Sequence, residues 1–494
     1  MLVDSGQEWT FDALEDMFME VERIAKDKFK LNTYPNQIDV INSEQMLDAY
    51  SAVGLPIYYN HWSFGQQFVQ EQEAYRRGHM GLAYEIVINS SPCVSYLMEE
   101  NTMLMQTLVT AHAAFGHNHF FKNNYLFRQW TDAEAIIDYL VFAKKYIKDC
   151  EERYGYDEVE LILDACHALQ NYGVDKYRRP SQLSAAQEEM LRKEREQYLH
   201  SQLNVIWSTI PTTEGEETEV EPNFPPNPEE NILYFIEKNA PNLEGWKREI
   251  IRIVRKVAQY FYPQGQTKVM NEGCATFFHY EIIHELYNEG KLTDGAMMEF
   301  YSSHTNVVFQ PDFDDQRYSG INPYALGFGM MQDIKRISTE PTDEDREWFS
   351  SQEWVGRGDW IDTIHWAIEN FKDESFIQQF LSPKLMRDMR LFSICDDEHD
   401  PQLEITGIHN HEGYKKVRET LSKQYNVGYR VPDIQVFNVD RWGDRSLELK
   451  HFMVDNRPLD TKSTVEVLNY IAFLWGYDVR LNSVDVNNET RCLY

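Results

Sequence analysis

Hydrophobic residues recur at helical spacing along most of this chain. Between residues 11 and 30 they return every three or four positions, and Thr10 stands where the N-cap of a helix belongs. The same period continues in later stretches, for which we predict helices: residues 94–121, 132–153, 157–171 and 231–289. The pattern therefore predicts a mainly α-helical fold with a helical core.

Strand patterns appear in two parts of the chain. Residues 81–89 form a short β-branched run followed by Ser-Ser-Pro, which indicates a strand and a turn. From residue 403 onward, strand-like and helical runs alternate. The predicted strands cover residues 403–408, 434–439, 447–454 and 478–482, and the predicted helices cover residues 412–424 and 461–475. We therefore expect a small α+β domain at this end.

Two polar stretches suggest where the chain divides. Residues 181–202 have the pattern of a charged, exposed helix, and residues 211–230 contain five prolines and a cluster of glutamates, which is typical of a linker or mobile loop. We therefore expect four successive segments. They are an N-terminal helical domain with one short strand (1–210), the acidic, proline-rich linker (211–230), a second helical block that packs on the first (231–400) and the C-terminal α+β domain (401–494).

The composition of the 494 residues suits a globular protein of roughly two or three domains, because 42% are hydrophobic and 14% aromatic. Lys and Arg number 47 against 80 Asp and Glu, which gives a formal net charge of -33. This charge repels nucleic-acid phosphates and anionic membranes at long range. We therefore expect no nucleic-acid partner.

The cysteines and the first residues indicate a compartment. The six cysteines include no C-x-x-C pair, so neither a disulfide framework nor a thiolate zinc site is indicated. The N-terminus lacks the basic region and apolar run of a signal peptide, and no window reaches the apolar length that spans a bilayer. We therefore expect a cytoplasmic protein without membrane insertion.

Two short runs, residues 111–117 (AHAAFGH) and 271–275 (NEGCA), together resemble a divided zinc-ligand set. In one family of zinc peptidases, a helical H-E-x-x-H supplies two imidazoles and a glutamate base, and a later helix beginning N-E-G supplies a carboxylate ligand. This chain has the histidines and the N-E-G, but Ala113 stands where the base belongs. The motif therefore predicts a metal site that lacks its usual base.

His112 and His117 are five residues apart and would point about 140° away from each other on an ideal helix. A single-turn π-bulge would realign them, and Gly116 would ease that distortion. The alternative is that one imidazole is a satisfied core group and the other lies at a helix end.

Glu272 and His279 are seven residues apart and share one face of a predicted helix, so they can face the histidine pair across a groove. We therefore predict His112, His117, Glu272 and His279 as ligands of a divalent metal, zinc first, with iron and manganese as alternatives. Singly, Glu272 would also suit a helix N-terminus, and His279 would suit packing among the aromatic residues beside it.

A hydrolytic metal site needs a proton acceptor, and the candidates are Glu85 on the predicted strand and Glu99 on the predicted helix. His304 and His119 are candidates to stabilise an oxyanion or join the ligands, although such residues are more often outer or surface groups. The strand itself could pair with an extended substrate or simply be buried and structural.

The chain resembles the SpoVR family, named for stage V sporulation protein R, and looks closest to the branch found in bacteria that do not sporulate. The resemblance rests on W-T-F-D at Trp9, L-N-T-Y-P-N-Q-I at Leu31, H-W-S-F-G at His61, A-Y-E-I-V-I-N-S at Ala83, F-F-K-N-N at Phe120, V-M-N-E-G at Val269 and I-N-P-Y-A-L-G at Ile321. It implies a role in spore cortex formation, or in stress and stationary-phase physiology, beside a serine-kinase-like partner and an accessory protein. Cys274, where the family usually has Trp, and His119 depart from the family pattern.

Our leading hypothesis is a mainly α protein whose zinc-peptidase-like helix pair forms a metal site, acting as a metal-dependent hydrolase of peptidase or amidase type in cell-wall remodelling. The alternative is a regulatory interaction protein whose metal site is structural or degenerate, because Ala113 removes the usual base. A metal-dependent oxidoreductase is a third hypothesis and would require a redox-active metal.

Overall fold

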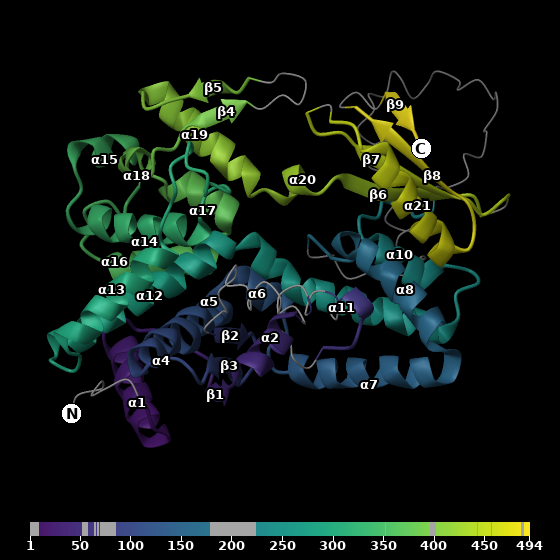
Figure 1. The fold of residues 1–494 in the computed structure, drawn as a ribbon. Coiled ribbons are helices and arrows are strands. Elements are labelled where there is room, and N and C mark those ends of the chain that lie inside the picture. Colours follow the sequence, from purple (N-terminus) through teal and green to yellow (C-terminus); the bar gives the residue numbers. More distant parts are fainter. Residues whose placement is uncertain are drawn as a thin grey trace, which may run out of the picture. The chain divides into compact units, whose positions relative to one another are not determined.

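The chain folds mainly into helices, with a small α+β region at its C-terminal end, as the computed structural model shows (Figure 1). The structure describes residues 9–51, 58–63, 66, 69, 85–177, 224–350, 352–395, 402–441, 443–455, 457–485 and 489–494. It divides into two compact units, Met1–Asp164 with Val257–Val431, and Ala165–Lys256 with Pro432–Tyr494. This division differs from the four successive segments expected, because each unit is built from two separate parts of the chain.

The first unit begins with α1 (Phe11–Asp27), which buries Met17, Val21 and Ile24. The Thr10 side chain accepts a hydrogen bond from the Ala13 amide, so the N-cap predicted from the sequence is confirmed. The helix ends earlier than predicted, and Lys30 adopts a left-handed φ of 55°.

A three-stranded sheet lies next along the chain, in the order β1-β3-β2. Its strands are β1 (Asn36–Ile41), β2 (Glu85–Ile88) and β3 (Cys93–Met98), with β1 parallel and β2 antiparallel to β3. We predicted one strand and the start of a helix here, so the expectation for residues 94–98 was wrong. The central strand is largely buried on both faces, and it therefore lacks the alternation that reveals a strand.

The histidine segment, residues 103–123, follows this sheet as a nearly continuous and mostly buried helix. Thr102 caps α4 (Met103–Thr110) by accepting a hydrogen bond from the Met105 amide. The segment continues as the π-helix η1 (Ala111–His117) and then α5 (Asn118–Asn123), before α6 (Tyr125–Trp130).

The first unit contains further helices and strands, which follow in chain order. They are α2 (Ser43–Ser51), α7 (Ile136–Tyr154), α12 (Lys268–Asn288), α13 (Asp294–Val307), α14 (Pro323–Thr339), α15 (Asp343–Trp348), α16 (Trp360–Asn370), α17 (Asp373–Phe380), α18 (Pro383–Asp388), β4 (Ser393–Cys395), β5 (Glu404–Gly407), α19 (His411–Gln424) and α20 (Val427–Arg430). Two boundaries between the units fall within α8 (Tyr156–Ala168) and α11 (Gly245–Gln266), and the third lies between α20 and the strand that begins at Asp433. One hydrophobic core joins α1, the histidine segment, α12 and α14.

Glycines let α12 approach its neighbours closely. A Cβ added at Gly116 would lie 2.5 Å from the Cα of Ala275, and one added at Gly273 would lie 2.5 Å from the Cα of Gly327. The helix therefore packs backbone to backbone against η1 on one side and α14 on the other. Gly116 was expected to ease the π-distortion, and the structure gives it this packing role.

The second unit contains α10 (Ile232–Asn239), the short η2 (Gln170–Tyr172) and a four-stranded sheet in the order β6-β7-β8-β9. The strands are β6 (Asp433–Val439), β7 (Leu447–Phe452), β8 (Val479–Val484) and β9 (Thr490–Leu493), with α21 (Thr461–Trp475) between β7 and β8. The three strands and the helix predicted in this part are confirmed. The predicted strand and helix at residues 403–424 are also present, as β5 and α19, but they belong to the first unit.

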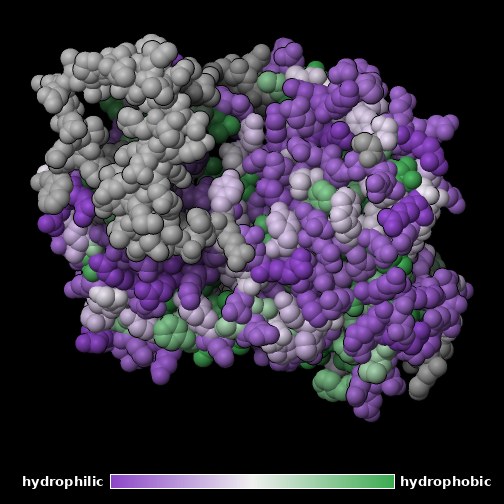
Figure 2. Space-filling view, turned by 180° about the vertical axis from the view of Figure 1, so that it is seen from behind, coloured by the Kyte–Doolittle hydropathy of each residue, from purple (hydrophilic) through white to green (hydrophobic). Residues whose placement is uncertain are grey.

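The predicted charged helix at residues 181–202, and residues 211–223 of the predicted linker, lie outside the described residues. Of the rest of that linker, Glu229 forms a β-bridge with Val436 in the second unit. On the face shown in Figure 2, hydrophilic residues cover most of the described surface and hydrophobic ones are scattered among them. None of the described helices is both long and apolar enough to cross a membrane.

Candidate metal centre

The π-helix η1 brings the two histidines of the first motif together. Hydrogen bonds in a π-helix span five residues instead of four, so residues 112 and 117 come onto one face. The ring centroids of His112 and His117 are 4.6 Å apart, and both residues are buried. The distortion inferred from their five-residue spacing is therefore present.

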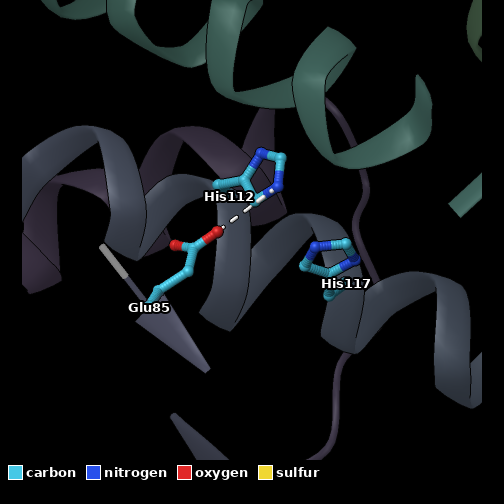
Figure 3. Close-up of side chains that lie close together, drawn as sticks. All are labelled: Glu85, His112 and His117. Carbon is cyan, nitrogen blue, oxygen red and sulfur yellow. Dashed lines mark ion pairs between the residues drawn. The ribbon is translucent and has the colours of Figure 1, made fainter. Parts of the chain in front are cut away.

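Two carboxylates face the Nε2 atoms of these imidazoles. Glu85 Oε1, on β2, lies 3.3 Å from His112 Nε2 (Figure 3). Glu272 Oε2, on α12, lies 3.7 Å from His112 Nε2 and 3.5 Å from His117 Nε2. Both carboxylates are mostly buried. Four side chains from three separate parts of the sequence thus converge on one small volume.

The outer ring nitrogens have other partners. His117 Nδ1 lies 2.9 Å from Asn271 Oδ1, an oxygen that can only accept, so the proton sits on Nδ1 and the Nε2 lone pair faces the carboxylates. His112 Nδ1 lies 2.9 Å from His279 Nδ1, and His279 Nε2 lies 3.1 Å from His304 Nδ1. Such outer contacts are what orient imidazoles that bind metals.

The spacing of the inner atoms suits a metal ion. Ligand atoms about 2.1 Å from a tetrahedral ion lie about 3.4 Å from one another, and the distances here run from 3.3 to 3.7 Å. Within the described chain, Oε2 of Glu85 and Oε2 of Glu272 are buried without a hydrogen-bond donor. A divalent cation would satisfy buried carboxylate oxygens of this kind.

The pKa values of the four clustered side chains shift in different directions. Burial raises the pKa of Glu85 to about 7, with His112 opposing this effect and Glu272 adding to it. Burial lowers the pKa of His117 to about 4. For His112, burial is outweighed by Glu85 and Glu272, which raise its pKa. The Glu85–His112 pair therefore holds a proton near neutral pH, whereas His117 is neutral and ready to bind a metal.

Glu272 is held ionised, and its helix is anchored at the start. Burial would raise the pKa of Glu272, but His117 and His112 outweigh it, and a hydrogen bond from Tyr324 lowers the pKa further. Asp373 caps α12 by accepting hydrogen bonds from the Val269 and Met270 amides, each 2.9 Å long. The sequence alone indicates no role for Tyr324, Asp373 or Asn271, although Asn271 lies in the V-M-N-E-G motif and Tyr324 in I-N-P-Y-A-L-G.

The remaining predicted residues lie at different distances from this cluster. His279, predicted as a ligand, instead contacts the outer nitrogen of His112. His304 Nδ1 contacts His279 Nε2 at 3.1 Å. Glu99 is exposed, and its carbonyl accepts a hydrogen bond from Trp9. His119 accepts a hydrogen bond from the Asn32 amide and packs on His365, away from the cluster.

Comparison with known proteins gives matches over nearly the whole chain. The family model described as SpoVR like protein matches residues 8–430, and that of the SpoVR-like C-terminal domain matches residues 432–486. The uncharacterized protein YcgB of Escherichia coli (strain K12) is 58% identical over 492 residues, covering 99% of this chain and 96% of the relative. No solved structure matches the chain. The chain therefore belongs to the SpoVR family.

Proposed function

We propose that this chain is a metal-dependent hydrolase of amide or peptide bonds, with zinc as the first candidate and iron or manganese as alternatives. The observation that carries the proposal is the convergence of two imidazole Nε2 atoms and two mostly buried carboxylates, with both outer imidazole nitrogens already engaged. His112, His117 and Glu272 would hold the ion, which leaves a position open, as catalytic zinc sites require.

Glu85 is the proposed general base in place of the residue missing at Ala113. Its pKa of about 7 is near the value at which a carboxylate accepts a proton efficiently at neutral pH. A zinc ion in such a site would supply an activated water as the nucleophile toward a carbonyl carbon. Glu85 would then take the proton of that water and deliver it to the leaving nitrogen.

The position of Glu85 also points to a substrate class. Glu85 lies on β2, an edge strand among the described strands of its sheet. An extended peptide can add to such an edge through backbone hydrogen bonds, which would bring its carbonyl groups beside Glu85. We further propose, from what the family resemblance implies, that the reaction serves cell-wall remodelling or stationary-phase stress in the cytoplasm, beside a serine-kinase-like partner and an accessory protein.

The second candidate is a regulatory interaction protein whose metal site is structural. The observation that favours it is the small, buried Ala113 at the position of the usual base. In that case Glu85, only 3.3 Å from His112 Nε2, would serve as the fourth ligand and close the site.

The role of Glu85 separates the two candidates. Metal content of the purified full chain would be measured beside hydrolysis of a mixture of cell-wall peptides, for the wild type and the Glu85→Gln variant. A base predicts that Glu85→Gln keeps the ion and loses hydrolysis by about a hundredfold or more; a ligand predicts that it loses the ion. The exposed Glu99→Gln is the matched control and should change neither.

Loss of the site itself is tested separately. A variant with His117→Ala and Glu272→Ala removes two of the proposed ligands and should bind no ion in this site. Undiminished binding in that variant, or a wild type purified and reconstituted without any bound ion, would end the proposal.

A further inference from the structure

A second group of potential metal ligands lies elsewhere in the first unit. It consists of His61, Glu160 and Asp164, and it shares no residue with the cluster around His112. Glu160 and Asp164 are four residues apart on α8, so both carboxylates lie on one face of that helix. His61 belongs to the H-W-S-F-G motif, which the proposed function leaves unused.

The three side chains meet at a single imidazole nitrogen. His61 Nε2 lies 3.2 Å from Glu160 Oε2 and 3.2 Å from Asp164 Oδ1. The side chains of His61 and Glu160 are only 2% and 9% exposed, whereas that of Asp164 is 31% exposed. We infer that these residues form a second site for a divalent metal cation, independent of the first.

An ion pair alone accounts poorly for this arrangement. A single N–H of His61 cannot point at both carboxylates, and a protonated imidazole would still leave one negative charge in excess. Both oxygens of Glu160 are buried without a donor in hydrogen-bond geometry within the described chain. The Tyr156 hydroxyl, which the Glu160 carboxylate holds at a pKa of about 12, could satisfy at most one of them. Buried carboxylate oxygens in this state are costly unless a cation is bound.

The distances and outer contacts suit such a cation. Ligand atoms around a small divalent ion lie about 3.4 Å apart, close to the two distances of 3.2 Å. His61 Nδ1 lies 2.7 Å from Ser63 Oγ, and Trp62 donates a hydrogen bond of 2.8 Å to Asp164 Oδ1. Outer contacts of this kind hold ligands in place, and the exposed side of Asp164 leaves room for water to complete the coordination.

The donor set narrows the choice of ion. One imidazole and two carboxylates favour Mn²⁺, Fe²⁺ or Zn²⁺ over ions that prefer thiolates. An ion bound there would hold residues 58–63 against α8. The site would thus be structural, in contrast to the catalytic role proposed for the first.

The test counts ions bound to the full chain. Purified, metal-stripped protein would be dialysed against Zn²⁺ and, separately, Mn²⁺, and the bound metal would be measured by mass spectrometry. We expect two equivalents for the wild type, one for Glu160→Gln, one for His117→Ala with Glu272→Ala, and none when all three changes are combined. Glu152→Gln, an exposed glutamate on α7, is the control and should bind two.

Spectroscopy identifies the site if Glu160→Gln proves unstable. Mn²⁺ bound to the His117→Ala, Glu272→Ala variant should show magnetic coupling to one imidazole nitrogen, and this coupling should disappear with His61→Gln. A wild type that binds no ion beyond that of the first site, or Mn²⁺ without imidazole coupling in the first-site variant, would overturn the second site. Failure of the first site alone leaves this result unaffected.

Discussion

Replacing Gly273 with alanine should push α12 away from α14 and weaken the proposed metal centre. The added Cβ would lie 2.5 Å from the Gly327 Cα and 2.8 Å from its carbonyl oxygen, and both are backbone atoms that cannot rotate away. Carbon atoms need about 3.5 Å, so the helices must separate by about 1 Å. Overpacking of this kind costs about 1–3 kcal/mol. Because Glu272 is the neighbouring residue, zinc affinity should also fall by about tenfold.

Gly265→Ala is the matched control, because nothing lies within 4 Å of a Cβ built at that position of α11. Both variants gain up to about 1 kcal/mol of helix propensity, so their difference isolates the packing cost. Urea unfolding of the full chain, followed by intrinsic fluorescence, should give Gly273→Ala a lower midpoint than the wild type and Gly265→Ala an equal or higher one. Equal midpoints for the two variants would refute the argument that backbone contact with Gly327 requires glycine here.

Three further predictions concern the groups around Glu272. Asp373→Ala leaves the Val269 and Met270 amides without their acceptor and should cost about 2 kcal/mol in urea unfolding, whereas the exposed Asp314→Ala should cost almost nothing. Tyr324→Phe removes the hydrogen bond that helps to keep the pKa of Glu272 low, and calorimetry should show zinc affinity reduced by about tenfold, with full recovery in a Tyr324 revertant. Zinc binding should release about one proton near pH 7, because Glu85, with a pKa of about 7, and His112, with a raised pKa, hold one in the metal-free protein. Affinity measured from about pH 6 to 8 should therefore rise with pH, and a flat profile would contradict the shared proton; His117, with a pKa of about 4, contributes only in acid.

Much of the fold could be predicted because its signals are local. The N-cap at Thr10 and the stripe of α1 depend on neighbouring residues, and the strands after residue 432 alternate as surface strands do. The strand β3 was misread as helix because it is the central, buried strand, and its apolar run carries no period. Its pairing with β1 involves residues almost sixty positions earlier, which no local pattern reveals.

The proximity of the two motifs could also be predicted, because it depends on the spacing of residues within each motif. The five-residue spacing of His112 and His117 is meaningful only if the helix is distorted, so the π-helix could be inferred from the sequence alone. The position of His279 was harder to predict. Its place on the same helical face as Glu272 brings its imidazole near His112, but does not say whether it meets Nε2, which faces Glu272, or Nδ1 on the other side of the ring. Only the three-dimensional packing of α12 against η1 decides between them.

The order of these residues along the polypeptide has a consequence for synthesis. Glu85, His112 and His117 leave the ribosome long before Glu272, and a large part of the second unit is translated between them. A nascent chain therefore carries an incomplete set of the proposed metal ligands until α12 emerges, and contacts so distant in sequence form slowly. If the proposed site holds an ion, that ion can be bound by the complete set of donors only after α12 has emerged and packed against η1.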